Sequence, residues 1–238
     1  MASDFGAVGD ALVAQYGVLV AGFADLDPSG PTDCAGWTVE DLETHVAITA
    51  RGLARIAGKG AEGTPVGVAS WTEQLPGLAD QMDTATKGER LSLSDQVPLV
   101  EAALQHPGDA LVQQLTGTHT LRDATVFRLV EAVVHGLDAG IAPHPPALKV
   151  VVKELARALA ERNPGKSVEV RVPPYAAVQC VEGPRHTRGT PPNVVETDGV
   201  SFVRLLAGRE QWSDLVADGR VRASGERSDL SDLLPLLG

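Results

Sequence analysis

The chain contains, at residues 126–138, the stretch Val126-Phe-Arg-Leu-Val-Glu-Ala-Val-Val-His-Gly-Leu-Asp138. Its apolar residues recur at helical spacing, which predicts a long helix from about Arg122 to Gly140. Glu131 and His135 are four residues apart, so their side chains stand one above the other on one face, and Asp138 continues the stripe. A carboxylate and an imidazole in this arrangement can bind one metal ion together.

Helical spacing also dominates the chain before this stretch. Residues 4–24 carry apolar side chains every three or four positions, and a second helix is predicted from about residue 39 to the middle fifties. Thr38 and Asp41 at its start resemble a capping box. Long helices joined by modest loops predict an antiparallel bundle. Weaker helical patterns cover residues 68–87 and 94–105.

A proline-rich connector divides the chain. Residues 140–146 contain three prolines, which cannot continue a helix. We therefore predict a helical domain over residues 1–142 and a second domain over 147–238. In the second, a helix over 146–162 precedes strand patterns with short helices between them, which indicates a small α+β domain. The predicted strands are 168–172, 176–181, 194–197 and 220–224, and the predicted short helices are 201–208, 211–219 and 228–234.

Charge and composition exclude some functions. The formal net charge of -11 argues against a nucleic-acid partner, whose phosphates would be repelled. Residues 1–144 hold 7 Lys+Arg and 19 Asp+Glu, a net charge of -12, whereas residues 145–238 hold 13 and 12, a net charge of +1. No run approaches the ~18 apolar residues of a membrane span, and the first ten residues lack a secretory signal pattern. These features predict a soluble, cytoplasmic protein without a membrane span.

The two cysteines do not indicate a disulfide framework, because Cys34 and Cys180 lie far apart in sequence. Cys180 falls in a predicted strand and is expected to be buried. Cys34 has no neighbouring base in the sequence, so neither cysteine is predicted to be a nucleophile.

The predicted second helix carries His45 on a face with Leu42 and Val46, which should point into the bundle. A buried imidazole without a partner costs free energy. If the two helices are neighbours, His45, Glu131 and His135 meet in the core. Three N and O ligands with one position left open are typical of a catalytic zinc site.

Each half of this pattern also has a common alternative explanation. A single Glu-x-x-x-His in a helix is more often a surface pair than a metal site. A lone inward histidine is more often a core residue whose hydrogen bonds are satisfied. Spacing by itself therefore leaves both the metal site and these structural roles open.

Two motifs taken together resemble a known family. Trp37-Thr-Val-Glu-Asp-Leu-Glu-Thr-His45 and Glu131-Ala-Val-Val-His-Gly-Leu-Asp138 are similar, in spacing and in order, to the DinB-like bundle of the mycothiol-dependent maleylpyruvate isomerase family. The resemblance covers about residues 5–140. It implies a four-helix bundle with zinc, or another divalent metal, at His45, Glu131 and His135. It also implies that Asp138 orients a neighbouring group.

The second domain has a resemblance of its own. The stretches 177–198 and 202–225 are similar to the bacterial sterol-carrier-protein-like domain that is attached to many members of that family. The resemblance covers about residues 148–238 and implies a sheet and helices that cover a pocket. The predicted fold is therefore mixed, with a DinB-like four-helix bundle followed by a small α+β sterol-carrier-like domain.

Two functions are consistent with these features. The first is a zinc-dependent isomerase or thiol transferase, in which the metal activates mycothiol or a similar small thiol for addition to an electrophilic substrate. Arg188 and Arg222 are then the predicted substrate-binding residues, because 10 of the 15 arginines follow residue 144 and a guanidinium grips a carboxylate bidentately. The second is a non-enzymatic protein that binds an apolar ligand in its second domain and has a structural or vestigial metal site. The sequence singles out no catalytic residue, no one substrate and no oligomeric state.

Overall fold

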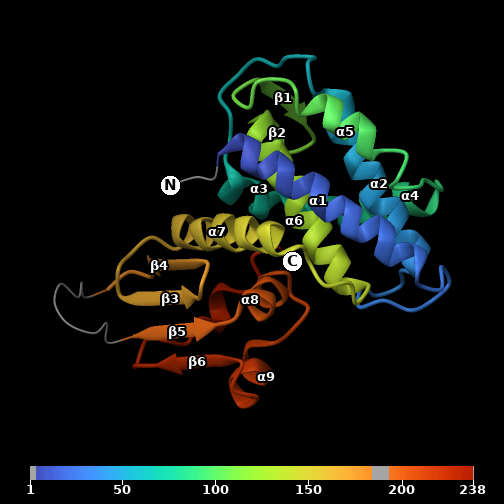
Figure 1. The fold of residues 1–238 in the computed structure, drawn as a ribbon. Coiled ribbons are helices and arrows are strands. Elements are labelled where there is room, and N and C mark those ends of the chain that lie inside the picture. Colours follow the sequence, from blue (N-terminus) through green and yellow to red (C-terminus); the bar gives the residue numbers. More distant parts are fainter. Residues whose placement is uncertain (1–3, 184–192, 238) are drawn as a thin grey trace. The chain divides into compact units, whose positions relative to one another are not determined.

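The computed structural model describes residues 4–183 and 193–237. The chain divides into two compact units, Met1–Val150 and Val151–Gly238. The first unit is helical apart from one small hairpin, and the second combines a four-stranded sheet with helices (Figure 1). The expected order, a helical domain followed by an α+β domain, is confirmed.

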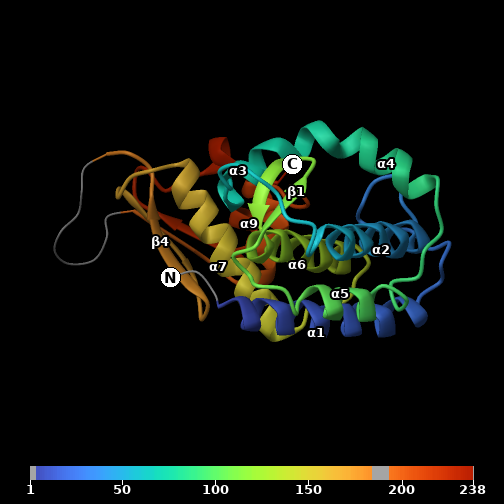
Figure 2. The ribbon, with the colours of Figure 1, turned by 90° about the horizontal axis from the view of Figure 1, so that it is seen from above.

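Three long helices form the first unit: α1 (Phe5–Ala24), α2 (Val39–Ile56) and α6 (Leu121–Asp138). The shorter α5 (Val97–Ala103) packs against α1 and α2 and completes the bundle. Figure 2 shows α2 and α6 as a middle layer, with α1 and α5 on one side and α4 (Ala79–Lys87) on the other. The stretch 68–87, where the sequence shows a weaker helical pattern, contains α3 (Val68–Gln74), a 3₁₀ turn (Leu75–Leu78) and α4.

The relative direction of α1 and α6 differs from the antiparallel bundle that loop lengths suggested. Gly22 lies against Ile141, and Gly136 lies against Leu19, so both helices advance in the same direction (Figure 1). The physical reason is the long connection between α2 and α6, which holds several short elements and allows the chain to cross over before α6 begins.

A β-hairpin precedes α6, and the hydrophobic pattern did not predict it. Strands β1 (Leu111–Gln114) and β2 (Gly117–Thr120) pair antiparallel around a tight turn. His119 is fully buried there, and its ring nitrogens contact Thr116 Oγ1 and the Val66 carbonyl, both at 2.8 Å. It therefore has a structural role at the hairpin.

Helix α1 is long and apolar enough to cross a membrane by length and composition alone, with a mean hydropathy of 1.5. In the structure, 44% of the most apolar 18-residue stretch of this helix is buried inside the protein. The core helix of a soluble protein and a signal sequence near an N-terminus both pass the same test. Its buried side chains include Val8, Leu12, Tyr16, Leu19 and Phe23.

The second unit is built on a sheet with strand order β4-β3-β5-β6, in which β3 and β5 are parallel and the other pairs antiparallel. The boundary between the units falls within α7 (Pro145–Arg162). All four predicted strands are confirmed, as are two of the three short helices. The segment predicted as a helix over 228–234 contains only a 3₁₀ turn (Ser231–Leu233), because Pro235 follows at once and cannot continue a helix. The elements are β3 (Val168–Val172), β4 (Ala176–Cys180), β5 (Val194–Thr197), α8 (Gly199–Leu206), α9 (Trp212–Ala217) and β6 (Val221–Ser224).

The start of α2 is fixed by the capping box that the sequence predicted. The Thr38 hydroxyl accepts a hydrogen bond from the Asp41 amide at 3.2 Å, and Asp41 Oδ2 accepts one from the Thr38 amide at 3.0 Å. These two bonds satisfy backbone donors that a helix otherwise leaves unpaired. The box therefore sets the first turn of the helix that carries His45.

We predict that Thr38→Ala lowers the free energy of unfolding by about 1 kcal/mol, because the helix loses its cap. Urea unfolding followed by circular dichroism measures the loss. Thr38→Ser keeps the hydroxyl and is the matched control. Equal stability of Thr38→Ala and wild type would contradict the prediction.

Candidate metal centre

Two histidines from different helices meet in the bundle. The ring centroids of His45 on α2 and His135 on α6 are 4.8 Å apart, with their planes at 80°. Each ring has one nitrogen engaged by a neighbour: His45 Nδ1 lies 3.2 Å from Thr86 Oγ1, and His135 Nδ1 lies 3.1 Å from Asp138 Oδ2. This arrangement leaves Nε2 of each ring as the candidate ligand atom.

The surroundings of His45 favour the neutral form that binds metals. The side chain is almost fully buried, at 4% exposure. Burial lowers the pKa of His45 well below its usual value, and the neighbouring His135 and Arg128 lower it further. An imidazole that is neutral at pH 7 is ready to donate a lone pair.

Glu131 lies one helical turn before His135, as the spacing predicted, but an arginine holds it. Arg128 Nη1 is 3.1 Å from Glu131 Oε2, and both side chains are largely buried. The contact is an ion pair without the alignment of a hydrogen bond, and within residues 4–183 and 193–237 this buried oxygen has no hydrogen-bond donor. The Glu131 carboxylate therefore has an unused acceptor position in the core.

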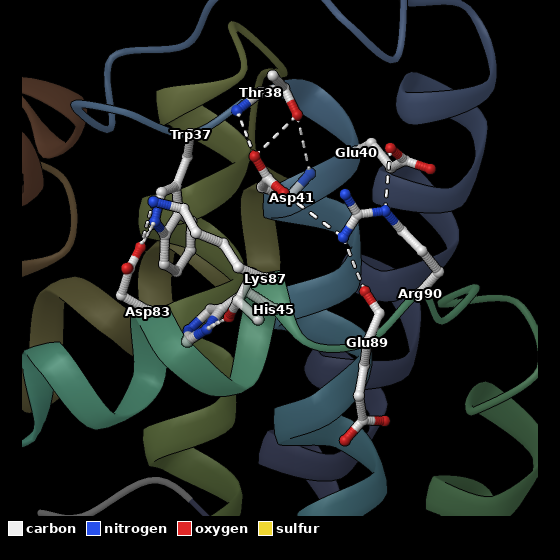
Figure 3. Close-up of polar contacts among 10 residues, drawn as sticks. Trp37, Thr38, Glu40, Asp41, His45, Asp83, Lys87, Glu89 and Arg90 are labelled. Atoms are coloured by element: carbon white, nitrogen blue, oxygen red, sulfur yellow. Dashed lines mark hydrogen bonds and ion pairs between the residues drawn. The ribbon is translucent and has the colours of Figure 1, made fainter.

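The loop before α2 brings an aromatic ring to the histidines. The Trp37 ring lies 4.9 Å from the His45 ring and 5.9 Å from the His135 ring. The Trp37 indole donates a hydrogen bond to Asp83 Oδ1 at 2.7 Å, which ties this loop to α4 (Figure 3). The tryptophan thus covers one side of the histidine pair and is itself held in place.

A second combination of ligand types shares one of these histidines. Within the part of the chain that the structure describes, one group of three such residues has all its ligand atoms within 4.8 Å of one another: Cys34, His135 and Asp138. The amide of Asp33 donates to the Asp138 carbonyl at 2.8 Å, which holds the Cys34 loop at the end of α6. Sequence reasoning found no base near Cys34, because this contact joins residues about a hundred positions apart.

Some of the predicted site residues lie together in the bundle, and others lie elsewhere in the chain. The structure brings His45, His135 and Asp138 together, and Glu131 lies one turn before His135 on α6, where it contacts Arg128. Among the described residues, the ligand atoms of His45, Glu131 and His135 do not form a group within 4.8 Å of one another. Arg222 is exposed on β6, in register with Glu196 of β5. Arg188 lies outside the described residues. The same region of the bundle also contains four residues that the sequence did not predict as members of the site: Thr86, Trp37, Cys34 and Arg128. For Arg128 a signal existed, since it precedes Glu131 by three positions on one helical face.

The helical unit matches a family model described as the mycothiol maleylpyruvate isomerase N-terminal domain, over residues 10–140. The chain belongs to this family. The second unit matches the family model of the bacterial SCP ortholog over residues 145–236.

Two solved structures are similar to this chain over both of its domains. The crystal structure of the mycothiol-dependent maleylpyruvate isomerase superposes with a TM-score of 0.59 and 17% sequence identity, covering 95% of each chain. A histidine-to-alanine mutant of that enzyme gives 0.58 and 16% with the same coverage. At this identity the likeness shows a shared fold. Among curated proteins no sequence matches the chain.

The two thiols of this family member should differ in reactivity. Cys180 is fully buried, and burial raises its pKa to about 11, whereas Cys34 is half-buried. We expect one thiol to react quickly with an aromatic disulfide reagent at mildly alkaline pH and the second only after denaturation. The Cys34→Ser variant should lose the fast phase. Two fast thiols in the native protein would contradict this assignment.

Proposed function

We propose that the protein is a zinc-dependent enzyme of the mycothiol-dependent isomerase or thiol transferase type. The observation that carries the proposal is the convergence of His45 and His135, each with Nδ1 engaged by a neighbouring side chain, one turn from Glu131. Membership of the family supports the choice of thiol, since the solved relative is mycothiol-dependent by its description. We propose a cytoplasmic location for the same reason.

The donor set fits a divalent metal of the zinc type. Two imidazole nitrogens and one carboxylate oxygen are ligands that zinc accepts, and three protein ligands are the usual number at a catalytic zinc. The buried Glu131 oxygen without a hydrogen bond is an acceptor that a cation would satisfy. We therefore propose His45, Glu131 and His135 as the ligands.

The chain's own residues prepare this centre. Asp138 accepts from His135 and so fixes the ring orientation, and Thr86 holds the His45 ring in the same way. A zinc ion held there would favour the thiolate form of a small thiol at neutral pH. Arg128 keeps a positive charge beside the site in a bundle that is otherwise acidic. No protein nucleophile is part of the proposal.

We predict that the purified protein holds about one equivalent of zinc or a similar ion. His45→Ala and His135→Ala should abolish the binding, while Cys34→Ser should keep it, which separates the proposed site from the cysteine-containing group. Elemental analysis and metal titration measure both. Loss of metal in Cys34→Ser with retention in His45→Ala would overturn the ligand assignment.

Chelation should lower the melting temperature, because a ligand that binds only the folded state stabilises it by about 2.7 kcal/mol at 100 times its Kd. For a domain of this size the shift is on the order of 5–10 °C. Calorimetry of loaded and chelated protein measures it, and His135→Ala should not respond. An unchanged melt of the wild type would contradict a site in the bundle core.

The substrate side of the proposal rests on Arg188 and Arg222. We expect mycothiol to bind the zinc-loaded protein in calorimetric titration and His45→Ala to abolish this binding. Arg222→Ala should weaken the binding of a carboxylate-bearing substrate about tenfold through loss of a charge-assisted contact. Glu196→Gln, which alters the residue in register with Arg222, is the neighbouring control. No mycothiol binding by the wild type, together with uptake of a fatty acyl probe, would favour an apolar-ligand carrier instead.

A further inference from the structure

Tyr16 lies on the face of α1 that packs against α6, and its side chain is fully buried. The contacts that neighbouring residues of α1 make with α6 show which part of α6 lies beside Tyr16. Gln15 Nε2 donates to the Ala132 carbonyl at 3.5 Å, and Leu19 lies against Gly136. Tyr16 is therefore level with the part of α6 that carries Glu131.

The Tyr16 hydroxyl has no hydrogen-bond partner among residues 4–183 and 193–237. A buried polar group without a partner costs roughly 1–3 kcal/mol, and native proteins contain few of them. Its persistence in the centre of a bundle calls for a partner that this form of the protein does not provide.

The α1–α6 contacts place Tyr16 beside two charged side chains of α6, Arg128 and Glu131. Burial raises the pKa of the Tyr16 phenol, Arg128 lowers it and Glu131 raises it further. A phenol is protonated at neutral pH, and its O–H is a hydrogen-bond donor. Of the two charged neighbours, only the Glu131 carboxylate can accept.

One oxygen of the Glu131 carboxylate lacks a hydrogen-bond donor among the described residues. Its buried Oε2 is paired with Arg128 Nη1 at 3.1 Å but, within the described part of the chain, receives no hydrogen bond. A donor without an acceptor on α1 and an acceptor without a donor on α6 lie in the same part of the core.

We infer that Tyr16 is a positioning residue of the metal centre, whose hydroxyl donates to the Glu131 carboxylate when that carboxylate turns to bind the metal. The inference rests on the proposed function. Carboxylates that bind metals are usually hydrogen-bonded through their other lone pairs, and the loss of such a partner typically costs 10–100-fold in metal affinity. The phenol also restricts the carboxylate to one orientation, which lowers the entropy lost on binding.

The test compares Tyr16→Phe with Tyr175→Phe, which makes the same change in the chain's other tyrosine, in the second unit. Zinc affinity is measured by competition with a chromophoric chelator. We expect about 10–100-fold weaker binding in Tyr16→Phe and wild-type binding in Tyr175→Phe. The metal-free Tyr16→Phe protein should be as stable as wild type or more stable, since it loses an unpaired buried hydroxyl. A merely structural role would lower that stability without changing affinity.

A second measurement does not depend on the Tyr16 variant. In the Tyr175→Phe protein, Tyr16 is the only tyrosine, so ultraviolet resonance Raman bands of the phenol report its hydrogen bonding alone. We expect zinc loading to change these bands from those of an unpaired hydroxyl to those of a donor. Cobalt-loaded Tyr16→Phe should also show an altered ligand-field spectrum, because the carboxylate is less restrained.

The outcomes separate this inference from the proposed function. If the wild type binds no metal, the proposed metal centre fails and the inference fails with it. If the wild type binds metal while Tyr16→Phe has unchanged affinity and the phenol bands do not move on loading, the inference alone is overturned. Weaker binding together with shifted bands supports it.

Discussion

The burial of helix α6 is the constraint on which the rest of the site depends. Twelve of its 18 residues are buried, because α1, α2 and α3 pack around it. A charged side chain in such a place has little water to solvate it and needs a partner inside the protein. From Arg128 onward, two pairs meet this need, Arg128 with Glu131 and His135 with Asp138, each three positions apart. At the start of the helix, Arg122 pairs with Asp123. The ionisable side chains of this helical face therefore find their partners within the same helix.

The two pairs have different consequences for a metal ion. The His135–Asp138 pair uses Nδ1 and can persist while Nε2 binds, so it pre-orients a ligand. The Arg128–Glu131 pair must be weakened, because the same carboxylate is the proposed ligand. Metal binding then carries the cost of an ion pair, and a new donor to the carboxylate reduces that cost. The freed guanidinium leaves a positive charge next to the centre, inside a domain whose net charge is otherwise strongly negative.

Long-range contacts hold the second histidine and its surroundings. Helix α4 is attached to α2 and its preceding loop by the Trp37–Asp83 hydrogen bond (Figure 3) and by the His45–Thr86 contact. Just after α4, Glu89 forms an ion pair with Arg51 of α2 at 2.8 Å. These contacts hold the Trp37 ring beside both imidazoles. The proposed metal centre is thus bounded by α4 as well as by α2 and α6, the two helices that carry its proposed ligands.

The sequence by itself determined the long helices, the capping box at Thr38, the strands of the second unit, and the one-face stripe of Glu131, His135 and Asp138. These features depend on periodicity and on neighbours within a turn or two, and a linear pattern records both. Only the tertiary structure decided that α1 and α6 run parallel, that the Trp37 ring covers the two histidines, that Arg128 holds Glu131 and that Cys34 reaches the end of α6. The hydrophobic pattern also missed the β1–β2 hairpin, whereas the helix over 228–234 is prevented by a local chain break at Pro235 that the sequence itself contains. In each case the outcome is set by contacts or chain breaks that compete with local propensity, and contacts between residues far apart in sequence leave no period for a pattern to detect.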